Sequence, residues 1–153
     1  MRPPPFQNFL DEYREPVYRL LVALVGPNEA DDSFQETFLA ALRTYPRLPA
    51  GSNLRAWILQ IARRKAIDAH RSRRRRPRPT PTVPDSPAAQ EEDRDPRIWR
   101  LVRHLPAKQR DAVVLRFVGD LPYREVARIT GGSEAGARQN VRLGLAKLRE
   151  GWR

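Results

Sequence analysis

A proline-rich, acidic segment near the middle of the chain, Pro77 to Pro96, limits what this sequence can fold into. Repeated prolines interrupt helices and sheets, and Val83 is the only large apolar residue that the segment could add to a core. We therefore expect a flexible linker, which its prolines keep extended at about 3 Å per residue, so that its ~20 residues reach up to ~60 Å. The linker divides the chain into two small blocks, residues 1–76 and 97–153.

The first block has the apolar periodicity of helices. Apolar residues recur at i, i+3, i+4 and i+7 from Val17 to Leu24. Pro16 predicts that the N-terminal stretch is two helical pieces, because an interior proline disrupts a helix. Gly26 and Pro27 give a stop signal, and a further helix is predicted from Leu54 to about Arg73. The predicted core side chains include Leu20, Leu21, Phe34, Phe38, Ala41, Leu42, Tyr45, Trp57, Ile58 and Ile61.

The second block contains a helix-turn-helix pattern over Tyr123–Arg149. Gly131 and Gly132 are suited to its tight turn, where positive φ favours glycine, and Ser133 is suited to cap the second helix. Upstream of it, Ala112, Val113, Leu115, Phe117 and Val118 are expected to be mostly core. No strand-type alternation persists in either block. We therefore predict an all-α fold of two small helical domains joined by the flexible linker.

The second helix of this pattern has a polar outer face. Ser133, Glu134, Arg138, Gln139 and Arg142 include donors that can bond guanine, adenine or phosphate. A helix-turn-helix presents such side chains to the DNA major groove. The alternative is a plain helical hairpin with a solvated basic face.

The charge distribution agrees with a polyanionic partner. The chain has a net charge of +11, divided into +6 and +8 on the two blocks and −3 on the segment between them. Lysine and arginine neutralise phosphates and release counterions, which favours binding to nucleic acid. A ribosomal or merely soluble basic protein is the competing interpretation.

Several function classes find no support in the sequence. There is no cysteine, so thiolate metal sites and disulfides are excluded. No apolar run approaches the ~20 residues of a membrane span, and the N-terminus lacks the apolar core of a signal peptide, so we expect a cytoplasmic protein without membrane insertion. His70 and His104 share no ligand cluster. We see no nucleophile–base pair, phosphate loop or metal spacing, and expect neither an enzyme with a small-molecule substrate nor a cofactor.

The motifs resemble one known family. The stretch LPAKQRDAVVLRFVGDLPYREVARITGGSEAGARQNVRLGLAKLR resembles region 4 of the extracytoplasmic-function (group 4) sigma factors of bacterial RNA polymerase. The stretch DDSFQETFLAALRTYPRLPAGSNLRAWILQIARRKAIDAHRSRRRR resembles their region 2. Order, spacing and linker agree over nearly the whole chain. The resemblance implies region 2 at 1–76, the linker at 77–96 and region 4 at 97–153.

The resemblance also implies partners. Such a protein binds core RNA polymerase through the β′ clamp helices and the β flap, and directs it to −35/−10 promoter DNA. Many relatives are held by an anti-sigma factor. The alternative is a sigma-like DNA-binding regulator or polymerase-binding factor that does not itself initiate transcription.

Carried onto this sequence, the family implies three sets of contacts. The polymerase set is Asp32, Gln35, Glu36 and Phe38, whose polar members could instead form a solvated helix face. In the −10 set, the loop from Arg47 to Asn53 would capture a flipped base. The −10 residues are Arg47, Ser52 and Asn53, with Arg55, Arg63 and Arg64 on phosphates. The −35 set is Ser133, Glu134, Arg138, Gln139 and Arg142.

The resemblance also implies roles for two segments beside these sets. The Arg73–Arg76 run would add affinity for DNA of any sequence. The acidic residues Glu91, Glu92, Asp93 and Asp95 would lie along basic polymerase walls, or serve as a solubilising spacer. The recognition helix departs from the family at Gly136, where glycine inside a helix costs roughly 1 kcal/mol relative to alanine. Gly144 lowers the helix propensity of the same helix a second time, at a position where a small residue is expected for packing.

Overall fold

The computed structural model describes residues 3–75 and 96–153. The predicted linker, apart from Pro96, and the acidic residues Glu91, Glu92, Asp93 and Asp95 therefore lie outside the described residues. Within the two described ranges every regular element is a helix, so the predicted all-α class is confirmed.

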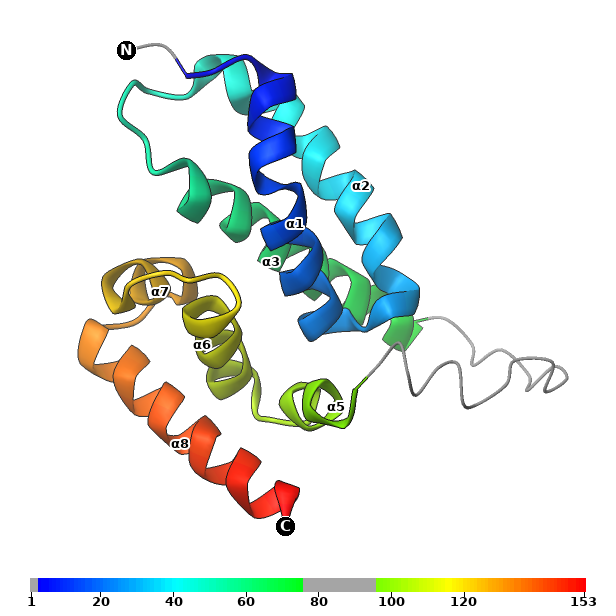
Figure 1. The fold of residues 1–153 in the computed structure, drawn as a ribbon, viewed down its shortest axis with the longest axis vertical. Coiled ribbons are helices and arrows are strands. Elements are labelled where there is room, and N and C mark those ends of the chain that lie inside the picture. Colours follow the sequence, from blue (N-terminus) through cyan, green and yellow to red (C-terminus); the bar gives the residue numbers. More distant parts are fainter. Residues whose placement is uncertain (1–2, 76–95) are drawn as a thin grey trace, which may run out of the picture.

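The first helical unit consists of α1 (Phe6–Val25), α2 (Pro27–Thr44), the short 3-10 helix η1 (Tyr45–Arg47) and α3 (Leu54–Arg75). Figure 1 shows α1, α2 and α3 packed together as a small bundle, and each of the three contacts the other two. Its core contains fully buried aliphatic side chains from α1 and α3, and an aromatic cluster in which Phe9 contacts Phe38, Tyr45 and Trp57. The three long helices therefore share one apolar interior.

Helix α1 runs through Pro16 without a break, so the prediction of two helical pieces is wrong. An interior proline costs ~3 kcal/mol because it removes a hydrogen bond and crowds the preceding turn. However, Phe9, on one side of the proline, and Leu20 and Leu21, on the other, are all fully buried in the same core. Each such burial contributes about 1.5–3 kcal/mol, so together they outweigh the proline. The predicted stop is correct, since Gly26 ends α1 with a φ of +86° and Pro27 starts α2.

The second helical unit consists of α5 (Arg97–Arg103), α6 (Ala107–Phe117), α7 (Tyr123–Thr130) and α8 (Glu134–Trp152). Helix α8 packs along α6 and α7. A Cβ at Gly144 would lie 2.8 Å from Val113 Cγ2, so the missing side chain lets α8 approach α6 closely. The small residue expected at this position therefore has a direct packing reason.

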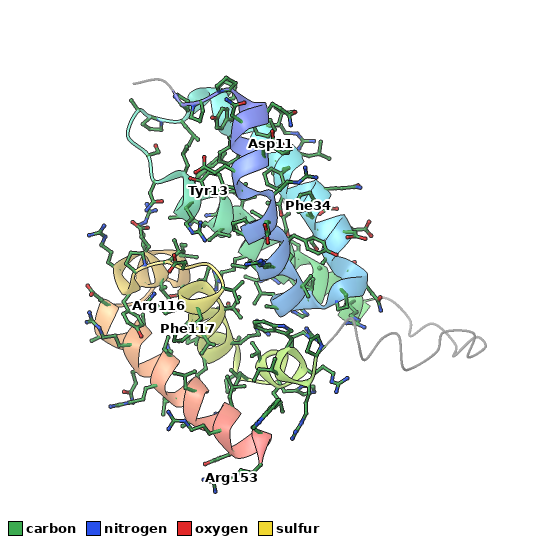
Figure 2. The ribbon with its side chains drawn as sticks, viewed as in Figure 1. Asp11, Tyr13, Phe34, Arg116, Phe117 and Arg153 are labelled. Atoms are coloured by element: carbon green, nitrogen blue, oxygen red, sulfur yellow. The ribbon has the colours of Figure 1, made fainter. Side chains whose placement is uncertain are left out.

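The two units pack against each other. Helix α1 contacts α5 and α6, and α3 contacts α7, which can be followed in Figure 1. Buried side chains of both units, such as Leu59 of α3 and Leu115 of α6, belong to one continuous hydrophobic cluster. Phe117 was expected in the core but is 56% exposed, at the end of α6 where Figure 2 labels it. The described chain is thus one packed body made of two bundles.

Candidate functional site

Helices α7 and α8 form the predicted helix-turn-helix. Gly131 ends α7 with a φ of +84°, and its N–H donates to the Ala127 carbonyl at 2.8 Å. Gly132 has no positive φ, so only the first glycine of the pair needs its conformational freedom. Ser133 caps α8 as predicted, because its Oγ accepts a hydrogen bond from the Gly136 N–H at 2.9 Å. Gly131 and Ser133 therefore determine where α7 ends and where α8 begins.

The outer face of α8 carries all the residues of the predicted −35 set. Ser133, Glu134, Arg138, Gln139 and Arg142 are exposed, whereas Ala137 and Val141 face the core. Side chains project along the outer side of α8 in Figure 2. The structure thus brings these five residues to one accessible surface.

The long polar side chains of this face bond one another. Arg138 Nη2 donates to Glu134 Oε1 at 2.8 Å, and the Arg138 guanidinium lies 5.1 Å from the centre of the Tyr123 ring. Arg142 donates to Gln139 in the same way. Exposed pairs of this kind contribute at most about 1 kcal/mol each. They orient the long side chains and can readily be exchanged for bonds to nucleic acid.

The predicted polymerase set divides into an exposed and a buried part. Asp32, Gln35 and Glu36 are exposed on one face of α2. Phe38 is only 6% exposed, and its ring centre lies 4.9 Å from that of Phe34. The structure therefore places Phe38 in the core, where its side chain packs under α2 and is not accessible to a partner protein.

Two leucines extend this face, and the sequence reasoning missed them. Leu39 is 55% and Leu42 is 50% exposed, although Leu42 was expected in the core. Leu39 follows Gln35 and Glu36 at i+4 and i+3, which places it among the exposed polar residues. This helical spacing is the feature of the sequence that could have identified Leu39 as exposed. The exposed face of α2 thus combines polar residues with an exposed leucine at their C-terminal end, and we call Asp32, Gln35, Glu36 and Leu39 the α2 ridge.

The loop between η1 and α3 is held by its own polar side chains. Ser52 Oγ donates to the Pro49 carbonyl at 2.6 Å. Asn53 Oδ1 accepts from the Ala56 N–H at 3.1 Å and so caps α3, as one of the two predicted caps. Any base contact by Asn53 would therefore use its amide nitrogen. Arg47 is exposed at the start of the loop.

The three arginines of α3 in the predicted −10 set do not share one environment. Arg64 is exposed, but Arg55 and Arg63 are half-buried between the two units. Arg55 Nε donates to the Gly119 carbonyl at 2.7 Å. Arg63 Nε donates to Asp111 Oδ2 at 2.9 Å, and its Nη1 donates to the Ile129 carbonyl at 3.3 Å. Two predicted phosphate ligands thus bond the second unit, which no local sequence pattern indicates.

Asp111 is the buried carboxylate at this junction. Its side chain is 5% exposed and also accepts from Arg110 Nε at 3.1 Å. A buried charge is tolerated only when it is paired and hydrogen-bonded, and Asp111 has a partner on each side of the boundary between the units. Nearby, Arg103 Nη1 of α5 donates to the Val22 carbonyl of α1 at 3.0 Å. Polar bonds therefore join the units at three places.

His70 lies close to the same junction. Its Nε2 bonds the Leu24 carbonyl at 3.0 Å, which requires the nitrogen to carry a proton. Burial, and next the positive charge of Arg110, lower the pKa of His70 below its ordinary value. The ring is therefore neutral at pH 7 and donates to the end of α1. At the same end of the first unit, Arg73 pairs with Glu29 at 3.3 Å.

The described part of the chain contains no cluster of three or more metal-ligating side chains. Among the helices of residues 3–75 and 96–153, none combines the length and apolar character that a membrane span needs.

Comparison with known proteins adds family matches for both units. Residues 9–76 match the family model of Sigma-70 region 2, and residues 96–148 match that of Sigma-70, region 4. The chain is 28% identical to the ECF RNA polymerase sigma factor SigX of Bacillus subtilis, over 95% of this chain and 82% of SigX. It is 33% identical to the ECF RNA polymerase sigma factor SigD of Mycobacterium tuberculosis, over 92% of this chain and 74% of SigD.

Two solved structures share the fold. One is the sigma factor RpoE in complex with the anti-sigma factor NepR from Bartonella quintana, with a TM-score of 0.76 and 20% identity over 95% of this chain and 94% of that one. The other is CnrH in complex with the cytosolic domain of CnrY, with a TM-score of 0.74 and 22% identity over 95% of this chain and 85% of that one. The likeness covers both helical units.

Proposed function

The chain belongs to the sigma-70 family as an extracytoplasmic-function sigma factor, and on that premise we propose that it binds core RNA polymerase and directs it to −35/−10 promoters. The observation that carries the proposal is the presence of both family regions, in order, on two folded units of one chain. We assign region 2 to residues 1–76, the linker to 77–96 and region 4 to 97–153. We propose that the protein acts by binding and not by catalysis. Because core RNA polymerase works in the cytoplasm, we propose the same location for this protein.

Polymerase binding is assigned to the α2 ridge. Its carboxylates and amide can pair with basic and polar groups of the β′ clamp helices, while Leu39 supplies exposed apolar area at its C-terminal end. The neighbouring Leu42, which is also exposed, extends this apolar area, and contiguous exposed apolar patches are typical of protein–protein contacts. Region 4 would add a second contact with the β flap.

Opening of the −10 element is assigned to the loop from Arg47 to Asn53 and to the arginines of α3. Extruding a base costs a few kcal/mol of stacking, which a pocket and phosphate contacts must offset. The loop is already ordered by the Ser52 and Asn53 hydrogen bonds, so little conformational entropy is lost on binding. Arg64 is accessible for phosphates, and Arg55 and Arg63 become accessible when they leave their partners in region 4.

Recognition of the −35 element is assigned to α8. The capped N-terminus of the helix presents backbone N–H groups and a positive dipole end toward phosphate, and Arg138, Gln139 and Arg142 lie on the exposed face behind it. These side chains can bond base edges in the major groove.

In vitro transcription with core polymerase tests the proposal. A pool of genomic promoter fragments should give discrete transcripts only when this protein is added, and sequencing of the bound DNA should return paired −35 and −10 motifs. Permanganate footprinting should detect unpaired thymines at the −10 position. Polymerase binding without open complexes would favour the alternative, a polymerase-binding regulator that does not initiate. Failure to bind core polymerase at all would overturn the proposal.

An anti-sigma factor is a further proposed partner. Of the solved structures that share this fold, one is a sigma factor in complex with the anti-sigma factor NepR, and another is CnrH in complex with the cytosolic domain of CnrY. Purification of the tagged protein from its own cells should recover one stoichiometric inhibitor that blocks transcription in the reconstituted assay.

A further inference from the structure

The ring of Tyr123, the first residue of α7, lies beside arginines from two other helices. The Cζ atoms of Arg138, on α8, and of Arg116, on α6, are both 5.1 Å from the centre of this ring. Figure 2 labels Arg116 at the end of α6. A guanidinium over the face of an aromatic ring at such a distance is attracted by the ring. Tyr123 therefore connects the helix assigned to −35 recognition with the rest of its bundle.

The Tyr123 ring has a defined place in the bundle. It is partly buried and packs against the hydrophobic cluster. Arg116, which lies over it, donates from Nη1 to the Leu121 carbonyl at 3.4 Å, and its Cζ is 5.8 Å from the centre of the Phe117 ring. The buried Nε of Arg116 has no hydrogen-bond partner among the described residues, a cost that its two aromatic contacts offset in part. The ring is thus held on one side by the core and by α6, and can orient a side chain of α8.

Arg138 is oriented and still has donors for DNA. Its Nη2 donates to Glu134 Oε1 at 2.8 Å, and its side chain remains 58% exposed. Glu134 takes one of the two Nη2 protons. The other Nη2 proton lies parallel to a proton of Nε or of Nη1, so one edge of the guanidinium keeps two donors. Such an edge fits a base that presents two acceptors in the major groove.

We propose that Tyr123 is a positioning residue for −35 recognition, whose ring holds the Arg138 guanidinium in the orientation that reads a base edge. The cation–π attraction acts on the charge of the guanidinium, so it persists while the N–H groups bond DNA. The inference rests on the proposed function, because it takes Arg138 to be a base contact. It adds a residue from the first helix of the motif, which the −35 set does not contain.

The ring should affect discrimination between sequences more than overall affinity. A mobile arginine that meets a wrong base can rotate towards a phosphate and recover its hydrogen bonds. An arginine that Tyr123 holds in place keeps its donors unpaired at the wrong base, which penalises that sequence. Holding the side chain before binding also reduces the rotamer entropy that is lost on the correct base. Loss of the ring should therefore relax sequence preference at one base pair.

The contact can be detected in the free full-length chain by nuclear magnetic resonance. In the parent protein the ring current of Tyr123 should shift the resonances of the Arg138 δ protons. Tyr123→Phe keeps the ring and should keep the shift, whereas Tyr123→Leu should remove it. Phe117→Leu is the matched control, because it removes an exposed ring that lies beside Arg116 instead of Arg138. Identical Arg138 resonances in the parent protein and in Tyr123→Leu would overturn the proposal.

Sequence preference is measured with the complex of the full chain and core polymerase. The parent complex selects duplexes from a random pool, and competition between the enriched duplex and its single-base variants gives a discrimination factor for each base pair. Arg138→Ala identifies the base pair that Arg138 reads. At this base pair Tyr123→Leu should lower the discrimination factor about 2- to 5-fold, the size expected from one exposed cation–π contact. Tyr123→Phe and Phe117→Leu should retain the parent factor.

A double variant separates positioning from packing. In an Arg138→Ala background, Tyr123→Leu should have no further effect on discrimination at this base pair. Tyr123→Met gives a second side chain without a ring and should behave as Tyr123→Leu does, while far-ultraviolet circular dichroism checks that both variants stay folded. If Tyr123→Leu weakens binding by the same factor on every duplex, the ring serves packing alone and the positioning role is rejected.

The proposed function and the positioning role fail in different ways. If the parent complex enriches no motif, the proposed function is wrong and the inference that rests on it falls with it. If Arg138→Ala weakens every duplex equally, Arg138 is a phosphate contact and no base reading remains for Tyr123 to support. If Arg138→Ala relaxes one base pair and Tyr123→Leu does not, the proposed function stands and the positioning role alone is wrong.

Discussion

The hydroxyl of Ser133 accepts the backbone N–H of Gly136, and a Cβ at position 136 would lie only 3.1 Å from that hydroxyl. The glycine that weakens α8 by propensity thus leaves room for the cap that starts the helix. Ser133→Ala should destabilise the protein by about 1 kcal/mol, the usual contribution of an N-cap. Thermal unfolding followed by circular dichroism measures the effect. Ser133→Asn retains a capping oxygen and should stay near the parent stability; an equal loss in both variants would contradict the assignment.

Gly144 is the second glycine in α8, and its substitution should be harmful. A Cβ would lie 2.8 Å from Val113 Cγ2, on a β-branched side chain that has little freedom to move. We expect Gly144→Ala to lose about 1–2 kcal/mol, since overpacking of ~1–3 kcal/mol exceeds the gain in helix propensity of up to ~1 kcal/mol. Denaturant titration measures this. Gly132→Ala, where the added Cβ meets nothing within 4 Å, is the control and should be close to neutral.

Leu39→Ser tests the α2 ridge without disturbing the core. The side chain is 55% exposed, so its truncation should change stability by less than about 0.5 kcal/mol. Binding to a β′ clamp-helix fragment should nevertheless weaken about tenfold, corresponding to loss of roughly 1.4 kcal/mol at the contact. Leu143→Ser, an exposed leucine on α8, is the matched control. Unchanged clamp binding by Leu39→Ser would remove this leucine from the interface.

Arg138→Ala tests how α8 reads DNA. If Arg138 bonds a base edge with both donors, its loss should cost about 1–3 kcal/mol and relax specificity at one base pair of the −35 element. Competition between single-base promoter variants measures this. Weakening by the same factor on every sequence would reassign Arg138 to a phosphate. Arg128→Ala removes an exposed arginine of α7 that pairs with Glu125 and serves as the comparison.

His70 makes stability depend on pH in a defined direction. Burial lowers the pKa of the folded-state ring below the ordinary value of about 6.5 that holds in the unfolded chain. The neutral ring therefore contributes stability above about pH 6.5, and the contribution is lost as the pH falls through the lowered folded-state pKa. His70→Gln should flatten the decline of the melting temperature between about pH 7.5 and 5. His104→Gln changes an exposed histidine and should leave the decline intact.

The sequence predicts best what depends on neighbouring residues. The Gly26 stop, the Ser133 cap and the Asn53 cap of α3 are local, because the groups that form them lie within a few positions of one another. Helical periodicity likewise placed the −35 set on one exposed face. Such features do not depend on which distant residues pack against the helix.

What the sequence could not supply depends on distant partners. Pro16 remains inside one helix because residues of α2 and α3 enclose both ends of α1, and the cost of a proline alone gives the wrong answer. Phe38 and Leu42 both lie near the edge of the apolar face of α2, where position along the helix does not decide burial. The partners of Arg55 and Arg63 are 64 and 48 residues away and come from another bundle. No spacing rule connects groups at those separations.

The continuous hydrophobic cluster shared by the two bundles couples the stability of one bundle to that of the other. Because α1 packs on α5 and α6, and because each bundle alone is of a size whose core is only marginal, we expect the two bundles to unfold in one cooperative transition. A substitution that weakens this shared cluster should therefore lower the unfolding temperature of both bundles together, whichever bundle carries it.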